Sequence, residues 1–230
     1  MAVNNSTFLE KRDRQIFSRN SKIKKSGVKG RDFVINWLLP EHRSRVYAMI
    51  TCPSALHCIE DCYVAQGYGY RMPNTRAKME MNLGLSLSEY FIEDVYKSLK
   101  KYKKLTHVRI HDGGDFYSEK YLVKWLKIIR DNPNVTFYAY TKEVKLFKKY
   151  KPFLPSNFIV IYSLGGRHDN LIDFEKDRHA RVFENIEDMP KEYINASDND
   201  LNATTSNINV GLVYHGVKKM KGFKEVQNVA

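Results

Sequence analysis

The sequence has no hydrophobic run that approaches the roughly 18 residues needed to span a membrane. Its N-terminus has no apolar stretch behind the charged residues, so a secretory signal peptide is not expected. It also lacks internal repeats and low-complexity linkers. We therefore expect a cytoplasmic protein. Its 230 residues, 43% of them hydrophobic, suffice for one sizeable core.

Cysteine is scarce, and the three copies, Cys52, Cys58 and Cys62, fall within one short segment. An odd number excludes a fully paired disulfide framework. Clustered cysteines in a cytoplasmic protein indicate metal or redox chemistry instead. We therefore predict that the three thiolates bind one metal centre.

Acidic residues are outnumbered, 26 against 38 Lys and Arg, which gives a formal net charge of +12. Nine of the basic residues lie within residues 1–31, where we predict a basic N-terminal arm that precedes a single domain over residues 32–230. Two further basic runs lie at 97–104 and 142–151. Such a surface attracts polyanions, so nucleic acid is a candidate partner. A solvated basic face without a partner is the alternative.

Short apolar runs rich in β-branched and aromatic residues alternate with helical patterns. This order predicts a parallel sheet with helical crossovers. About six strands are too few for a closed eight-stranded barrel. We therefore predict an α/β fold, a partial (β/α)6 barrel of the TIM type with its helices outside. The predicted strands are 46–51, 107–111, 135–140, 158–163, 180–183 and 208–213.

Between the strands, apolar residues recur at helical spacing. Ser88 and Ser118 are expected to cap two of these helices. The polar segment 184–206 is weakly periodic, which predicts a long loop of the kind that covers a binding site. The predicted helices are 87–101, 118–130 and 142–150, with a weaker pattern at 170–178.

Polar residues and glycines follow the predicted strands, as expected at the carboxyl ends of a parallel sheet. Gly113 and Gly114 leave the backbone open to a ligand, and the carboxylate of Asp115 can hold an ammonium group. Lys142 ends the third strand and Ser163 the fourth. Helix caps and plain turns are the alternative roles for these residues.

Two kinds of metal centre suit the C-x5-C-x3-C spacing. Zinc would need a fourth ligand, which His57, His107 or His111 could supply. A [4Fe–4S] cluster can use three thiolates and leave one iron open to a small molecule, and we favour it. Three cysteines that bind nothing are the third alternative.

Four segments carry a family resemblance: CPSALHCIEDCYVAQG, HDGGDFYS, FYAYTK and IYSLGG. Through them the sequence resembles the radical S-adenosylmethionine (radical SAM) superfamily, and in particular the phage "gene product eighty-eight"-like proteins. The resemblance implies a [4Fe–4S] cluster, S-adenosyl-L-methionine at its open iron, and an electron donor. It also implies an enzyme of bacteriophage origin, with a substrate that the sequence does not identify. A macromolecule is one candidate.

Carried over by position, the resemblance makes Cys52, Cys58 and Cys62 the cluster ligands, although the superfamily's usual spacing is C-x3-C-x2-C. Its Gly-Gly-Glu motif, which contacts the methionyl amine, corresponds to residues 113–115. Asp61 stands where an aromatic residue normally precedes the last cysteine, and Tyr63 follows instead. The cofactor-binding residues that the resemblance implies are Tyr63, Gly113, Gly114, Asp115, Lys142 and Ser163.

The sequence does not identify a catalytic residue. Tyr68, Tyr70, His168 and Arg178 are expected near the mouth of the barrel, but none is singled out. A non-catalytic iron–sulfur or zinc protein, whose basic surface binds nucleic acid or a host protein, is the alternative function.

Overall fold

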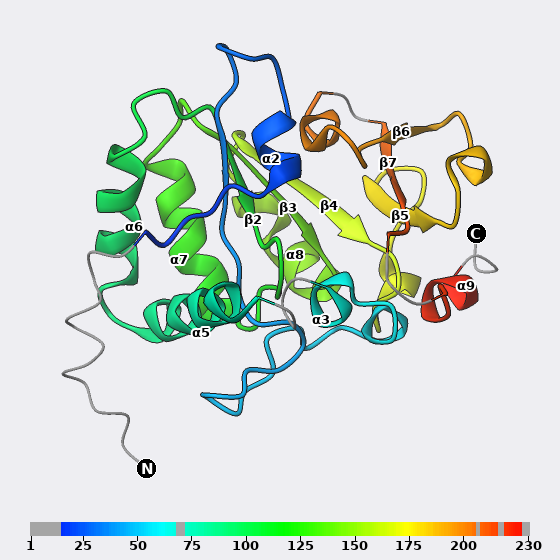
Figure 1. The fold of residues 1–230 in the computed structure, drawn as a ribbon, viewed down its shortest axis with the longest axis horizontal. Helices are drawn as coiled ribbons and strands as arrows, with labels where there is room; N and C mark the ends of the chain where they lie inside the picture. The colour runs from blue at the N-terminus through cyan, green and yellow to red at the C-terminus, as the bar shows by residue number, and fades with distance from the viewer. Residues whose placement is uncertain (1–14, 68–71, 206–207, 216–218, 227–230) are drawn as a thin grey trace.

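The computed structural model describes residues 15–67, 72–205, 208–215 and 219–226 (Figure 1). Its centre is a seven-stranded sheet in which every pair of neighbouring strands is parallel. The strand order is β1-β2-β3-β4-β5-β7-β6, and the sheet is curled into a half-barrel. The strands are β1 Val34–Asn36, β2 His107–Ile110, β3 Thr136–Thr141, β4 Phe158–Ser163, β5 His179–Phe183, β6 Tyr193–Asn195 and β7 Asn209–Val213.

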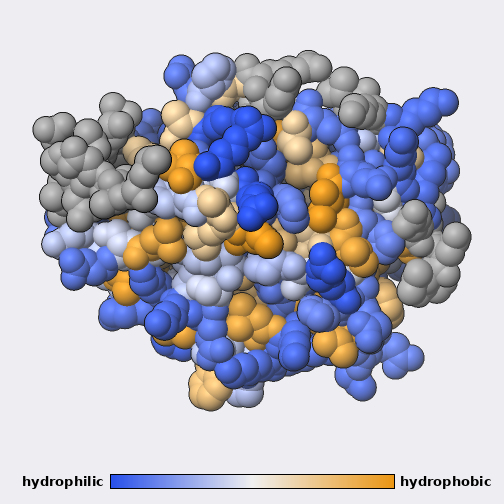
Figure 2. All heavy atoms as spheres, turned by 90° about the horizontal axis from the view of Figure 1, so that it is seen from below, coloured by the Kyte–Doolittle hydropathy of each residue, from blue (hydrophilic) through white to orange (hydrophobic). Residues whose placement is uncertain are grey.

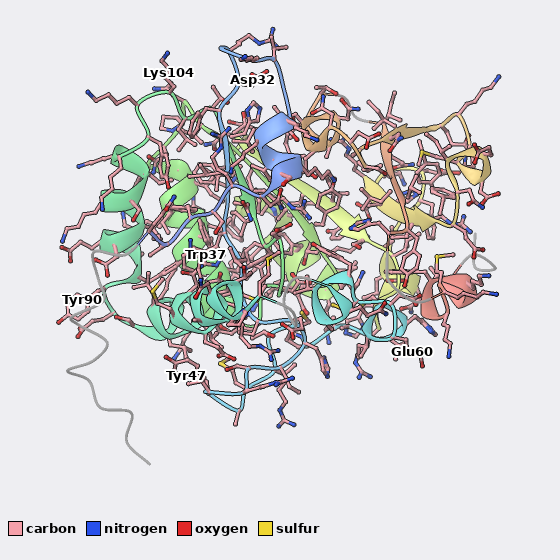
Figure 3. All side chains as sticks on the ribbon, viewed as in Figure 1. Asp32, Trp37, Tyr47, Glu60, Tyr90 and Lys104 are labelled. Carbon is pink, nitrogen blue, oxygen red and sulfur yellow. The ribbon has the colours of Figure 1, made fainter. Side chains whose placement is uncertain are left out.

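Helices cover the convex face of the sheet. Val108 and Phe137 point to this side and share one buried core with helical side chains. Trp37, near the centre of Figure 3, makes edge-on ring contacts with Phe91 and Trp125 in that core. The helices that pack here are α5 Pro73–Leu87, α6 Phe91–Lys100, α7 Glu119–Arg130 and α8 Val144–Tyr150.

The concave face is partly polar, and two short elements cover it. These are helix α2, Ser21–Lys25, and the 3-10 turn η5, Asp200–Ala203. Ile23 and Leu201 pack there against Tyr138 of β3. The α/β fold with a curled parallel sheet is therefore confirmed.

Asp200 ties α2 and η5 to the sheet. It is fully buried, and its carboxylate accepts hydrogen bonds from Lys22 Nζ at 2.9 Å, Arg109 Nη1 at 3.0 Å and Tyr138 OH at 2.6 Å. Burial acts to raise the pKa of Asp200, but the charges of Arg109 and Lys22 hold it below the ordinary value. The cover of the concave face is thus linked to the strands through a buried ion pair.

Replacing Asp200 with Asn should lower the free energy of unfolding by about 3–5 kcal/mol, because the half-buried Lys22 loses its carboxylate and the buried Arg109 is left with its longer, 3.5 Å ion pair to Asp112. Urea unfolding at neutral pH measures this loss. Asp198→Asn changes the same charge at an exposed neighbouring position and should have an effect below about 0.5 kcal/mol. Equal losses in the two variants would show that the buried pair contributes nothing to stability.

The strand predictions hold except at the start of the sheet. Residues 107–111, 135–140, 158–163, 180–183 and 208–213 correspond to β2, β3, β4, β5 and β7. The prediction at 46–51 is wrong, and the first strand is β1 instead. Val46 and Ile50 are 59% and 46% exposed, so this apolar run has no sheet to enter, and Ala48 interrupts it with a φ of 52°.

The helix predictions at 118–130 and 142–150 are confirmed as α7 and α8, and Ser118 caps α7 by accepting a hydrogen bond from Tyr121 N. Residues 87–101 contain α6, but Ser88 ends α5 rather than starting α6. Helix α5 itself was not predicted.

Two weaker predictions need correction. Residues 170–178 form no helix beyond the 3-10 turn Asp169–Leu171. The segment 184–206 is more than a loop, because β6 and η5 lie within it. The polar pattern of this segment did not indicate the short strand β6, which pairs with β7 at the edge of the described sheet.

Part of the predicted basic arm, residues 1–31, lies in the described structure. Its residues 15–31 pack into the domain, where Phe17 and Ile23 are fully buried, while residues 1–14 lie outside the described part. No helix among the described residues has the length and apolar character needed to cross a membrane.

Candidate metal and cofactor site

The loop that carries the three cysteines lies against the carboxyl ends of β2, β3 and β4. Asp115 N, just after β2, donates a hydrogen bond to Thr51 O at 2.9 Å. Beyond β4, Gly165 O accepts from Cys58 N at 3.3 Å, and Gly166 forms an antiparallel bridge with Ala55. The structure thus brings the cysteine loop to the edge of the sheet where the sequence placed it, although the loop does not follow a strand directly.

The three cysteines are free and half-buried. Burial raises the pKa of the Cys52 thiol well above its ordinary value, and the nearby charges of Asp115, Cys62 and Cys58 raise it further. Burial also raises the pKa of Cys62, and the charge of Cys58 adds to that shift. The three sulfur atoms therefore lie within reach of one another's charge.

The thiols do not form a finished ligand set. Among the described residues, no group of three or more His, Cys, Asp or Glu side chains is arranged to hold a metal ion. A metal centre would require the loop between Cys52 and Cys62 to draw the sulfur atoms together.

The three histidines considered as a fourth zinc ligand lie in different places. His57 is on the cysteine loop itself, in the 3-10 turn His57–Ile59. His107 begins β2 and therefore lies at the opposite end of that strand. His111 is turned toward α7, where its Nε2 is 2.9 Å from Tyr121 OH, and burial lowers its pKa to about 3. Only His57 shares the cysteine loop.

The two glycines after β2 fit closely against the chain that follows β1. Gly114 has a φ of 77°, and a Cβ there would lie 2.6 Å from Leu39 Cβ. A Cβ on Gly113 would lie 3.1 Å from Leu39 O. Packing alone therefore requires small residues here, whether or not a ligand approaches them.

The carboxylate of Asp115 is fully engaged within the protein. It accepts hydrogen bonds from Phe116 N at 2.8 Å, Thr141 Oγ1 at 2.7 Å and Lys142 N at 2.8 Å. Burial nevertheless raises its pKa. A ligand amine would have to share this carboxylate with three protein donors.

Lys142 and Ser163 contact each other across the ends of β3 and β4. The ammonium group of Lys142 donates to Ser163 Oγ at 2.8 Å, Ser163 O at 3.0 Å and Leu164 O at 2.8 Å. In the part of the chain that the structure describes, Lys142 has no ion-pair partner. Its charge is thus set among neutral oxygens close to the cysteine loop, which suits an anionic centre.

Tyr63, which follows Cys62, reaches from the cysteine loop to the end of β2. Its hydroxyl donates to Asp112 O. Its ring centroid lies 5.4 Å from that of His215, after β7. Tyr63 therefore connects the last cysteine to the concave face of the sheet.

The short C-terminal helix α9, Gly222–Val226, holds the other side of the loop. Asp61 accepts hydrogen bonds from Lys221 N and Phe223 N at 2.8–3.0 Å. Glu60, labelled in Figure 3, marks this side of the loop near α9. The sequence did not predict this contact, because nothing in the local pattern links residues 61 and 223.

Glu143 is a second residue that the sequence did not single out. It is buried, and its carboxylate accepts hydrogen bonds from Ser54 N and Ser54 Oγ, both at 2.9 Å. Burial and the nearby negative charge of Asp115 raise the pKa of Glu143 to about 7. Two adjacent buried carboxyl groups therefore stand between the sheet and the cysteine loop.

Comparison with known proteins bears on the family. The sequence model of one family, described as "Gene product 88", matches residues 9–227. The chain belongs to the Gene product 88 family.

Two curated relatives are also similar to this Gene product 88 chain over short segments. The Gene 88 protein of Mycobacterium phage L5 is 46% identical over 56 residues, 24% of this chain and 23% of that protein. The Gene 88 protein of Mycobacterium phage D29 is 38% identical over 58 residues, 25% and 24% of the two chains. The alignments thus span about a quarter of these relatives. No solved structure matches the chain.

The family assignment confirms the phage part of the resemblance, and the radical SAM part stays a prediction. Tyr68 and Tyr70 lie outside the described residues.

The raised pKa of Glu143 predicts a pH-dependent stability. The folded state keeps a proton that the unfolded state has lost between about pH 4.5 and 7, so the free energy of unfolding should fall as the pH rises through this range. Glu143→Gln should remove this part of the slope, as measured by urea unfolding at a series of pH values.

Glu119→Gln is the control for this experiment. Hydrogen bonds from Lys149 and Tyr150 lower the pKa of this exposed carboxylate, so its titration lies below the range in question. If wild type and Glu143→Gln keep the same slope between pH 4.5 and 7, Glu143 does not hold the extra proton.

Proposed function

We propose that the chain is an iron–sulfur protein of the radical SAM type, in which Cys52, Cys58 and Cys62 bind one [4Fe–4S] cluster. The observation that supports this proposal most is the position of the three thiols. They share one loop at the carboxyl ends of parallel strands, the edge at which α/β enzymes assemble their sites.

The chemistry of the site also supports a resident metal centre. Burial and mutual repulsion disfavour ionisation of Cys52 and Cys62, and the nearby charge of Asp115 disfavours ionisation of Cys52 further. Iron bound to thiols deprotonates them and compensates their charge.

Further residues of the chain have roles in this proposal. Gly113 and Gly114 shape the turn beside the loop, and Asp115 fixes the end of β3 against that of β2. Lys142 and Ser163 present a cation and a hydroxyl next to them. With the cluster and S-adenosylmethionine bound, the site would supply one-electron reductive chemistry.

A second function is supported by the same geometry. Asp115 and Lys142 are already satisfied by protein groups, so a non-catalytic iron–sulfur or zinc protein needs no change in their contacts. The net charge of +12 would let such a protein bind nucleic acid. The face that contains the cysteine loop is less suited to this, because apolar residues interrupt its hydrophilic surface (Figure 2). The exposed apolar side chains in and near the loop include Val46, Ile50, Leu56, Ile59 and Met72.

The cluster proposal predicts a brown protein with about four iron and four sulfide ions per chain after anaerobic purification. Cys52→Ser, Cys58→Ser and Cys62→Ser should each lose most of this iron, as measured by metal and sulfide content. His57→Ala is the matched control on the same loop and should keep the iron.

Other outcomes of the metal and sulfide measurement separate the alternatives. Stoichiometric zinc in the wild type that is lost in His57→Ala would show that the thiols form a zinc site and not a cluster site. A stable cluster that does not cleave S-adenosylmethionine after reduction would leave the non-catalytic function. Substoichiometric iron and zinc in the wild type would contradict both proposals.

A further inference from the structure

Three hydrogen-bond donors on the concave face of the sheet have no partner among the described residues. They are Tyr140 OH, Arg109 Nε and Arg178 Nη2, and each atom is buried. Buried polar atoms in folded proteins almost always have a hydrogen-bond partner. Three unpartnered donors in one region therefore need an explanation.

The strand register brings the three residues together. Tyr140 of β3 pairs with Ile161 of β4, and Tyr162 N donates to Arg178 O at the start of β5. Arg178 thus lies at the level of Tyr140, two strands away. On the other side of Tyr140, Arg109 of β2 places its guanidinium carbon 5.1 Å from the centroid of the Tyr140 ring.

The electrostatics agree with this placement. Burial and the charge of Asp200 raise the pKa of Tyr140, while the positive charges of Arg109 and Arg178 both act to lower it. The two arginines therefore lie close enough to the hydroxyl to act on its charge from both sides.

The charges on this face leave one positive charge without compensation. Lys22 and Arg109 are balanced by Asp200 and Asp112, with which they form ion pairs. Arg178 uses its Nε to donate to Ile208 O, and none of the described carboxylates lies within ion-pair distance of it. A group that accepts several hydrogen bonds and carries about one negative charge would satisfy all three donors.

We propose that Arg109, Tyr140 and Arg178 form a binding site for the oxyanion group, a carboxylate or a phosphate, of a small ligand on the concave face of the half-barrel. The three donor atoms are buried, but Tyr140 and Arg178 are half-buried as whole residues, so a ligand would enter beside their exposed parts. The charges of both Asp200 and Tyr63 act on Arg109 and Tyr140, so the site lies near these two residues. Tyr63 directly follows Cys62, the last of the three cysteines. The proposal does not depend on the metal cluster.

The hydroxyl of Tyr140 allows a sharp test. Tyr140→Phe removes only an unpartnered group, so the ligand-free protein should keep its melting temperature or gain a little. Tyr138→Phe is the matched control on the same strand and face. Its hydroxyl donates to Asp200 at 2.6 Å, and its loss should lower the melting temperature. Equal losses in the two variants would show that Tyr140 is already bonded within the fold, and would overturn the proposal.

Binding is tested with sodium phosphate and sodium acetate against sodium chloride at equal ionic strength, by thermal shift of the purified full chain. At least one of the two oxyanions should raise the melting temperature of the wild type. A shift with phosphate identifies a phosphate site, and a shift with acetate identifies a carboxylate site. Tyr140→Phe and Arg178→Gln should bind that anion about tenfold more weakly or worse. Arg181→Gln removes the same charge from β5, the strand that directly follows Arg178, at a position that faces the other side of the sheet. This variant should bind the anion as the wild type does.

Two further results decide the proposal. If neither anion shifts the wild type, or if Arg181→Gln weakens binding as much as Arg178→Gln, the site does not exist. The variant with all three cysteines replaced by Ser should bind the anion as the wild type does. The anion site and the metal centre can therefore fail independently of each other.

Discussion

The carboxylate of Asp115 joins the parts of the chain from which the candidate site is built. It accepts hydrogen bonds from Thr141 Oγ1 and Lys142 N, and so fixes the end of β3 to the end of β2. The backbone N–H of the same residue holds Thr51, immediately before Cys52. These bonds are buried, where hydrogen bonds to a charged acceptor are strong and an unmade bond is costly. Asp115 therefore positions the start of the cysteine loop relative to the sheet, while Glu143 and the bridge between Ala55 and Gly166 hold the residues that follow.

This arrangement concentrates groups that resist ionisation. Burial raises the pKa of Cys52, Cys62, Asp115 and Glu143, and Asp115 is among the causes for both Cys52 and Glu143. The charge of Lys142 lies on the other side of Asp115 and is surrounded by neutral oxygens. In such a region the iron of a bound cluster would offset the charge of the thiolates that hold it.

The parts of the fold that could be predicted from the sequence are those with a strong local pattern. β2 to β4 are apolar runs bounded by turn residues, and Ser118 marks the start of α7. Residues 46–51 have the same β propensity but no neighbouring strand, and β1 is only three residues long. Helix α5 was not predicted because its buried side includes the polar Asn82, which interrupts the apolar pattern. The amide of Asn82 donates hydrogen bonds to Ile16 O and Leu38 O.

Some residues of the candidate site could also be predicted from the sequence, and others could not. The cysteine loop and the residues after β2, β3 and β4 could be placed together, because carboxyl ends of parallel strands share one edge of a sheet. Glu143 could not be identified, since its role depends on Ser54, 89 residues away in the chain. The contact between Asp61 and helix α9 could not be predicted either, because the residues that form it are about 160 positions apart in the chain.

The concave face raises a different question, because parallel sheets usually bury apolar residues on both sides. Along β2 and β3, Val108 and Phe137 supply the convex core, while the alternate positions Arg109, Tyr138 and Tyr140 face the other way. Replacing a buried ion pair by well-packed apolar side chains is often neutral or stabilising. Asp200 compensates Arg109 Nη1 and Tyr138, but not Arg109 Nε or Tyr140 OH. Fold stability therefore accounts for the apolar packing of the convex face and for the Asp200 network, and the proposed oxyanion ligand would satisfy the remaining donors of the concave face.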